Sequence, residues 1–221
     1  MNVTVYGDSI LKGVLFENGK YVVDHACEQK PTERFGLKVT NRSRFGSTLP
    51  KALSRIEKDA VTPAEGEVAL LEFGGNDCDY DWAAIAAAPE AEHACKTPPA
   101  QFLDCYRRAI RLLRGSGRTP VLSSLPPINA ELYLRFLCRD GLSRENIVRW
   151  LGDVQRIYRW QENYSQMVEQ LAREEDTPLV DLRRPFLQDA RAPSALLCAD
   201  GIHPSRLGQG LIYQAFCAAM G

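Results

Sequence analysis

Hydrophobic positions along the chain fall into short apolar runs that alternate with longer amphipathic stretches. The short runs predict five β-strands, at residues 3–6, 37–40, 68–73, 120–125 and 178–182. Amphipathic spacing and cap signals predict helices at residues 49–60, 100–114 and 154–175. A further helix is predicted after Pro204. This alternation is typical of a parallel sheet with helical crossovers, so we expect one doubly wound α/β domain over residues 1–221.

Two segments depart from this alternation. Residues 79–99 are rich in Ala, Pro and acidic residues and contain His93, which we expect to be solvated. Residues 126–153 join the fourth strand to the long helix and mix aromatic with charged residues. We expect both segments to be excursions from the sheet, and the second to shape the rim of a pocket.

The balance of charge narrows the choice of partners. The 221 residues include 27 Lys and Arg against 28 Asp and Glu, a net charge of −1, and 45% of residues are hydrophobic. These are globular proportions without the basic excess that nucleic acids or anionic membranes attract. We therefore expect a small-molecule partner, with neither nucleic acid nor membrane. The sequence does not indicate an oligomeric state.

Cysteine usage and the N-terminal residues indicate a compartment. The seven cysteines are an odd number without a C-x-x-C pair, which is typical of reduced thiols, and Cys27 lies two residues from a histidine, His25. The sequence has no run of about 18 apolar residues and no signal-peptide pattern. These features predict a cytoplasmic protein.

Four polar segments follow predicted strands or precede the last helix, at residues 7–10, 41–48, 74–77 and 200–204. In a parallel sheet the ligand crevice lies beyond the carboxyl ends of the strands, so we expect these segments to meet there. A serine hydroxyl can act as a nucleophile when a histidine takes its proton and an aspartate orients the imidazole. Ser9, His203 and Asp200 can supply these roles. The Gly46 and Ser9 N–H groups and the Asn76 amide can stabilise an oxyanion.

These four segments resemble the four sequence blocks of the SGNH hydrolase superfamily, the GDSL esterases and lipases. The resemblance implies a flavodoxin-like three-layer α/β/α fold and no metal or organic cofactor. It also implies that Ser9 is the nucleophile, His203 the base and acid, Asp200 its orienter, and Gly46 and Asn76 oxyanion donors. The sequence departs from the usual blocks at two positions, Ile10 in place of Leu and Ser43 in place of a second Gly.

Each residue also has a structural interpretation. Ser9 could cap a helix, Asn76 could serve a turn, and Asp200 with His203 could form a surface loop. Four matching placements together favour the catalytic interpretation. Aromatic residues at near-helical spacing are expected to pack in the core rather than to form a substrate platform: Trp150, Tyr158, Trp160 and Tyr164. Basic residues near the second block are expected to be solvated rather than to bind an anion: Arg34, Arg42 and Arg44.

The leading hypothesis is a serine hydrolase that cleaves carboxylic esters with short acyl groups such as acetyl, including those of O-acetylated carbohydrates. Acyl transfer or thioester cleavage by the same three residues is an alternative. A non-catalytic protein that binds a glycan or peptide is another. A metal-dependent hydrolase is disfavoured, because the three histidines lack metal-ligand spacing.

Overall fold

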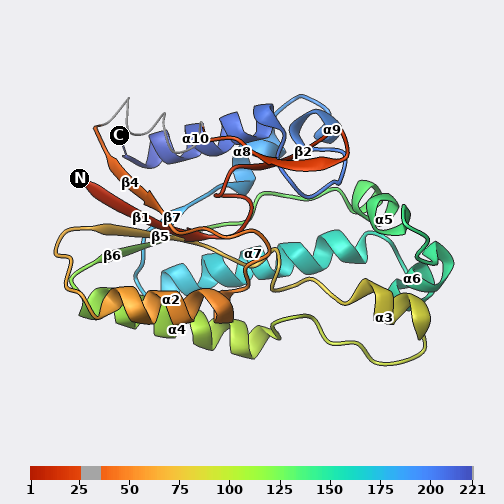
Figure 1. Cartoon of the computed structure of the whole chain (residues 1–221), viewed down its shortest axis with the longest axis horizontal. Helices are drawn as coiled ribbons and strands as arrows, with labels where there is room; N and C mark the ends of the chain where they lie inside the picture. The colour runs from red at the N-terminus through yellow and green to blue at the C-terminus, as the bar shows by residue number, and fades with distance from the viewer. Residues whose placement is uncertain (26–35, 221) are drawn as a thin grey trace.

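The computed structural model describes residues 1–25 and 36–220, so Cys27 and Arg34 lie outside the described residues (Figure 1). All pairings within its larger sheet are parallel, and its strands are ordered β4-β1-β5-β6-β7. When only these five strands are numbered along the chain, the order is 2-1-3-4-5, which is the flavodoxin-like order of doubly wound proteins. The predicted fold class is therefore confirmed. The strands are β1 (Asn2–Gly7), β4 (Lys38–Asn41), β5 (Val68–Glu72), β6 (Thr119–Ser123) and β7 (Leu179–Val180).

The last strand is shorter than the apolar run at residues 178–182 predicts. Directly after β7, Asp181 Oδ1 accepts hydrogen bonds from the backbone N–H groups of Arg183 and Arg184, both at 3.0 Å. Such a bond from an aspartate to the backbone that follows it turns the chain. Leu182 therefore leaves the sheet, although its side chain is fully buried.

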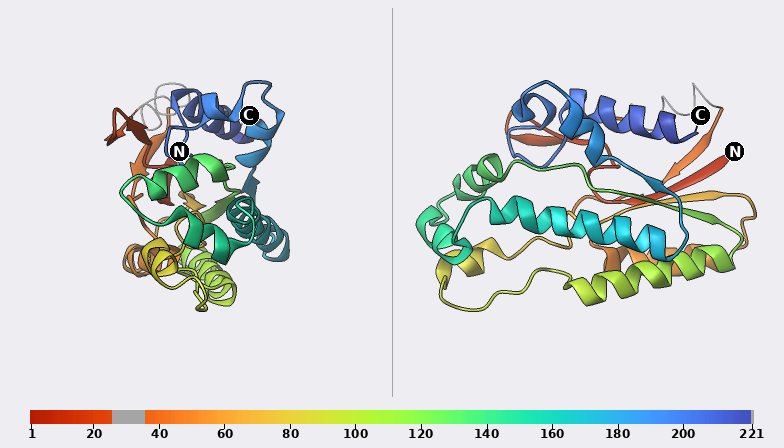
Figure 2. Two further views of the ribbon diagram at one scale, coloured as in Figure 1. Left: turned by 90° about the vertical axis from the view of Figure 1, so that its right-hand side faces the viewer. Right: turned by 180° about the vertical axis from the view of Figure 1, so that it is seen from behind.

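Helices cover both faces of the sheet and complete the three layers (Figures 1 and 2). On one face, Tyr6 and Phe73 of the sheet region join the larger core with Phe102, Tyr106 and Tyr164. The three helices of this face are α2 (Leu49–Ala60), α4 (Pro99–Gly115) and α7 (Arg156–Glu174). The smaller core on the other face involves α8 (Arg183–Gln188), α9 (Pro193–Leu196) and α10 (Arg206–Met220).

The two excursions contain helices that the alternation of strands and helices did not predict. They are α3 (Trp82–Ala87), α5 (Ala130–Cys138) and α6 (Arg144–Leu151). These helices gather beyond one end of the sheet (Figure 1) and share a separate apolar cluster around Ile85, Leu134 and Ile147. Each has only six to nine residues, too few for a clear helical period, and depends on tertiary packing. We call α3, α5 and α6 together the cap.

A hairpin of β2 (Val14–Glu17) and β3 (Lys20–Val23) follows the first strand, where a doubly wound protein would place a helix. Its two-residue turn consists of Asn18 and Gly19, with φ of 52° and 75°. Asn-Gly is the strongest short-range signal for this kind of turn. The dipeptide is therefore a signal for the hairpin that the alternation of apolar runs and amphipathic stretches does not contain.

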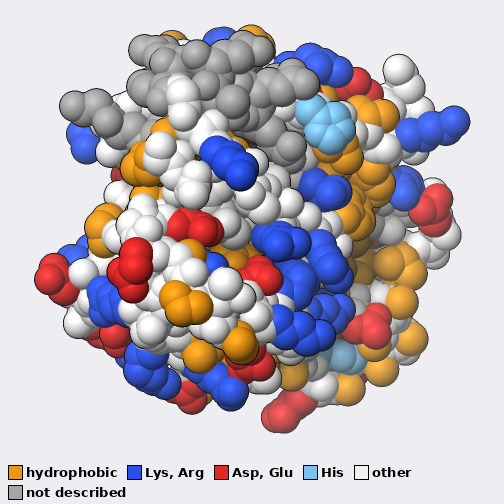
Figure 3. Space-filling view, turned by 60° about the vertical axis from the view of Figure 1, so that its left-hand side comes forward, with side chains coloured by type: hydrophobic (Ala, Val, Ile, Leu, Met, Phe, Trp, Pro, Cys, Tyr) orange, Lys and Arg blue, Asp and Glu red, His pale blue; other side chains and the backbone are white. Residues whose placement is uncertain are grey.

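The surface carries charges of both signs. On the face seen in Figure 3, Lys and Arg side chains gather in a group with Asp and Glu side chains around it. Ion pairs are frequent, for example Arg107 with Glu174 at 3.0 Å and Arg108 with Glu57 at 2.6 Å. Among the described residues, no helix is long and apolar enough to cross a membrane.

Candidate active site

The structure brings Ser9, Asp200 and His203 together from the two ends of the chain. His203 Nε2 lies 2.9 Å from Ser9 Oγ, and His203 Nδ1 lies 2.6 Å from Asp200 Oδ2. Asp200 is fully buried, His203 is 3% exposed and Ser9 is 7% exposed. Residues 8–13 form turns that lead directly into β2, so Ser9 does not cap a helix. The hydrogen-bonded series Asp200–His203–Ser9 has the order that the sequence predicts.

Hydrogen bonds between the Asp200 side chain and the backbone fix the loop that carries Asp200 and His203. Asp200 Oδ1 accepts hydrogen bonds from the N–H groups of Ile202 at 3.2 Å and His203 at 3.1 Å. Gly201 has φ of 75°, and a Cβ there would lie 2.6 Å from the backbone nitrogen of Tyr133. Only glycine combines this conformation with such close contact to α5. The cap therefore abuts the loop that orients His203.

Gly46 and Asn76 line the same cavity as Ser9 and His203, as predicted. Gly46 lies in the left-handed region, with φ of 65°, in the loop between β4 and α2. Asn76 lies in the turn after β5, and its Nδ2 donates to Asp8 Oδ2 at 2.7 Å. An amide nitrogen carries two hydrogens, so this bond orients the side chain and leaves one N–H for another acceptor.

Two buried carboxyl groups, Asp8 and Glu72, lie next to Asn76, and neither is among the site residues that the sequence predicts. Asp8 and Glu72 are each 1% exposed, and Glu72 pairs in register with Gly7, the neighbour of Asp8. Burial raises the pKa of Asp8, and burial together with the charge of Asp8 raises the pKa of Glu72 well above its usual range. Two adjacent buried carboxyl groups cannot both ionise readily.

The hydrogen bonds indicate which of these two carboxyl groups holds the proton. Asp8 accepts from Asn76 Nδ2 and from the N–H of Ile10 at 2.8 Å, and its hydrogen bond with the Glu72 side chain lowers the pKa of Asp8 and raises the pKa of Glu72. Donors stabilise a carboxylate, so Asp8 carries the charge and Glu72 is protonated. The signal in the sequence was an acidic residue inside an apolar strand.

Asp77, the neighbour of Asn76, binds the first residue of α2. Its Oδ1 accepts the N–H of Leu49 at 2.9 Å, and burial raises its pKa from 3.8 to about 7. The folded state therefore binds this proton more tightly than the unfolded chain does. Its contribution to the free energy of unfolding is present at pH 4 and is lost as the pH rises towards about 7.

This shift predicts the behaviour of Asp77→Asn, which keeps the acceptor for Leu49 and removes the titration. Relative to the unchanged protein, the variant should gain about 3 kcal/mol in the free energy of unfolding between pH 4.5 and 7.5, since one pKa unit corresponds to about 1.4 kcal/mol. Urea unfolding at both pH values measures this change. Asp104→Asn alters an exposed carboxylate and is the control. A difference that stays constant with pH would contradict the assignment.

The cavity beside Ser9 has a volume of about 140 Å³. Apolar and aromatic side chains from the segments after β5 and β6, from α7 and from the cap form much of its wall, including Tyr80, Trp82, Leu125, Tyr133, Ile157 and Trp160. Trp160 thus lines the cavity, and its indole N–H donates to the backbone oxygen of Cys78 at 3.0 Å. Tyr164 is fully buried in the core, as predicted, and Trp150 packs edge-on against Tyr80 at 4.9 Å.

Asp79 connects the cap to the turn after β5. Its Oδ1 accepts hydrogen bonds from the indole N–H of Trp82 at 2.7 Å and from the hydroxyl of Tyr133 at 3.0 Å. Its Oδ2 accepts from Lys96 Nζ at 2.8 Å. One carboxylate therefore joins α3 and α5 to the segment that carries Asn76.

The remaining residues considered in the sequence analysis lie outside this arrangement. His93 is partly exposed, with Nε2 2.8 Å from the backbone oxygen of Ala88, and His25 is exposed two residues beyond β3. Arg42 lies 3.7 Å from Asp59, and Arg44 is exposed. The six described cysteines are free thiols.

Comparisons with known proteins concern the family and the fold of the chain. The model of the GDSL-like lipase/acylhydrolase family matches residues 5–211. A search of curated proteins gives no match. An acetyl xylan esterase from Geobacillus stearothermophilus is a similar solved structure, with a TM-score of 0.69, 19% identity, and coverage of 100% of this chain and 94% of the other.

Two further solved structures have the same fold. A lipase/acylhydrolase from Enterococcus faecalis has a TM-score of 0.64 and 18% identity, over 99% of this chain and 94% of the other. A member of the lipolytic G-D-S-L family from Veillonella parvula has a TM-score of 0.66 and 16% identity, over 98% of this chain and 96% of the other. The chain belongs to the GDSL-like lipase/acylhydrolase family and is an ester hydrolase.

Proposed function

We propose that the protein hydrolyses carboxylic esters with short acyl groups through a Ser9–His203–Asp200 triad. The observation that carries this proposal is the continuous hydrogen-bonded series from Asp200 Oδ2 through the His203 ring to Ser9 Oγ. A carboxylate at Nδ1 selects the tautomer that is protonated on Nδ1, and Nε2 is then free to accept the serine proton.

In the first half of the reaction, Ser9 Oγ forms a bond to the ester carbonyl carbon and gives its proton to His203 Nε2. The carbonyl oxygen becomes an oxyanion, which accepts hydrogen bonds from the N–H groups of Ser9 and Gly46 and from the Asn76 amide. The tetrahedral intermediate then breaks its bond to the alcohol oxygen, and this oxygen takes the proton from Nε2. Water repeats these steps on the acyl-enzyme and releases the carboxylic acid.

Asp8 and Glu72 act through Asn76. The bond from Asn76 to Asp8 fixes the plane of the amide, so its second N–H is oriented before the oxyanion forms. The protonated Glu72 limits the negative charge behind the oxyanion to a single carboxylate. A fixed donor needs little reorganisation in the transition state.

The size of the cavity supports a short acyl group. Its volume of about 140 Å³ is close to that of an engineered apolar cavity of ~150 Å³ that accommodates benzene. An acetyl or butyryl group fits beside Ser9 within such a volume, whereas a long chain would have to leave it. The acetyl xylan esterase among the similar structures adds support for acetyl esters.

Initial rates on the p-nitrophenyl esters of acetate, butyrate and octanoate test this proposal, beside a set of acetylated sugars. We expect kcat/KM for octanoate to be at least about tenfold below that for acetate, because methylenes that do not fit a pocket each lose binding energy. A Ser9→Ala protein supplies the blank for each ester. Equal or faster hydrolysis of the octanoate ester would refute the preference for short acyl groups.

A further inference from the structure

Two exposed aromatic side chains lie beside the buried imidazole of His203. Tyr21 of β3 is 41% exposed, and Phe45 in the loop before α2 is 52% exposed. Their ring centroids are 4.9 Å apart and the rings are tilted by 60°. Both side chains line the cavity that contains Ser9. We call Tyr21 and Phe45 together the aromatic shelf.

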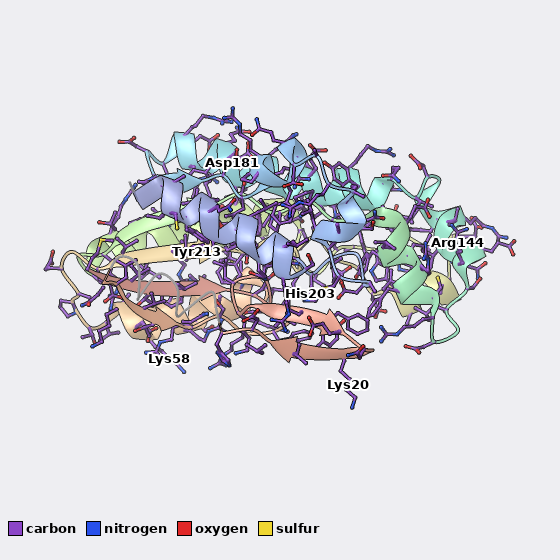
Figure 4. The ribbon with its side chains drawn as sticks, turned by 90° about the horizontal axis from the view of Figure 1, so that it is seen from above. Lys20, Lys58, Arg144, Asp181, His203 and Tyr213 are labelled. Atoms are coloured by element: carbon purple, nitrogen blue, oxygen red, sulfur yellow. The ribbon has the colours of Figure 1, made fainter. Side chains whose placement is uncertain are left out.

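The aromatic shelf contacts His203 directly. The ring of Tyr21 meets the imidazole edge-on, with centroids 5.3 Å apart, and the ring of Phe45 lies nearly parallel to it, at 12° and 6.0 Å. Figure 4 shows His203 beside the β2–β3 hairpin, whose tip carries Lys20. The hairpin and the Phe45 loop therefore form one flank of the imidazole.

Contacts behind the shelf hold Tyr21 in place. Tyr21 packs against Phe16 of β2 at 5.0 Å, and Phe16 meets Phe136 of α5 edge-on at 5.2 Å. The guanidinium of Arg139 covers Phe136 at 3.7 Å. The hairpin is thus supported by the cap, and the exposed ring of Tyr21 belongs to a connected aromatic group.

The direction of proton transfer indicates which part of the substrate meets the shelf. This step rests on the proposed function, in which His203 Nε2 returns its proton to the alcohol oxygen. That oxygen must come within hydrogen-bond distance of Nε2, so the group attached to it extends past the imidazole. Because the aromatic shelf flanks the imidazole, it is the surface that this group meets.

The chemistry of the shelf selects a ring. Aromatic side chains offer broad apolar faces, which pack best against other flat groups in stacked or edge-on contacts. A linear alkyl alcohol covers little of such a surface. We propose that Tyr21 and Phe45 form the subsite for the alcohol portion of the ester, and that this portion presents a flat apolar face, as an aryl group or a sugar ring does.

The test varies the alcohol while the acyl group stays acetyl. Substrates are phenyl acetate, an acetylated methyl pyranoside and ethyl acetate, and the variants are Phe45→Ala, Tyr21→Ala and the double substitution. For at least one of the two ring esters, kcat/KM should fall about three- to tenfold for each ring removed, the range that aromatic contacts span. Hydrolysis of ethyl acetate should change less than twofold. Loss on only one ring ester supports the subsite and identifies its source.

Two controls separate the subsite from general damage. Tyr21→Phe keeps the ring and should retain the discrimination between ring and ethyl esters. Val61→Ala alters an exposed apolar side chain on α2's C-terminal side and should leave every rate unchanged. An equal loss on all three alcohols, or a loss that follows the acyl group across phenyl acetate, propionate and butyrate, would overturn the proposal. If Ser9→Ala is inactive in the same assays, such a result rejects the subsite alone, and the triad mechanism stands.

Discussion

Replacing Ser9 by alanine should lower kcat for ester hydrolysis by about 10⁶-fold, the loss seen when a nucleophilic serine is removed from a hydrogen-bonded triad. The side chain lies at a turn, 2.9 Å from His203 Nε2, and no other described hydroxyl bonds to this nitrogen. Without Oγ no acyl-enzyme can form. Initial rates on p-nitrophenyl acetate give the loss, and the pre-steady-state burst of p-nitrophenol should disappear as well.

Ser43→Ala is the matched control for this experiment. Ser43 is also a buried serine, and its Oγ has no hydrogen-bond partner among the described residues. Its removal should therefore leave kcat within about threefold of the original value, as for substitutions away from a functional contact. A Ser9→Ala protein that is as active as Ser43→Ala would exclude Ser9 as the nucleophile.

Asp200→Asn should lower kcat by about 10⁴-fold while the protein stays folded. The asparagine oxygen can still accept the backbone N–H groups of Ile202 and His203, so the loop keeps its shape. The amide that replaces Oδ2 is a donor, and it favours the imidazole tautomer with its proton on Nε2. In that tautomer Nε2, the nitrogen that faces Ser9 Oγ, already carries a proton and therefore cannot accept the serine proton.

Thermal unfolding and kinetics together check the Asp200 prediction. The melting temperature should be close to that of the original protein, since most hydrogen bonds of the loop remain, and KM should change less than kcat. A loss below about tenfold would show that the carboxylate does not select the tautomer. A protein that unfolds at a much lower temperature would show that Asp200 acts mainly on the loop.

The closeness of Ser9, Asn76 and His203 could be predicted because a parallel sheet places the carboxyl ends of its strands at one edge. Ser9 and Asn76 each lie in the turn after a strand, and Asp200 precedes His203 by three residues in a loop that contains Gly201 and Pro204. The roles that we propose for them rest on residue type and order. The distances between Ser9, Asp200 and His203 now agree with that prediction.

The surroundings of the triad depend on tertiary contacts that the pattern of residues does not contain. Glu72 looks like a charged interruption of an apolar strand, and only its burial against Asp8 indicates that it is protonated. Tyr21 belongs to a hairpin that the predicted alternation of strands and helices does not include. Phe45 lies in a loop, where sequence gives no orientation for a ring. The short helices of the cap likewise form because they pack on one another.

Covalent labelling of Ser9 tests the central claim most directly. The folded protein is treated with a fluorophosphonate, digested and analysed by mass spectrometry, with the Ser43→Ala and Ser9→Ala proteins treated in parallel. We expect one adduct per chain on the peptide that contains Ser9, complete loss of esterase activity on labelling, the same adduct in Ser43→Ala and none in Ser9→Ala. Active protein that remains unlabelled, or an adduct on another serine that accompanies the loss of activity, would contradict the mechanism.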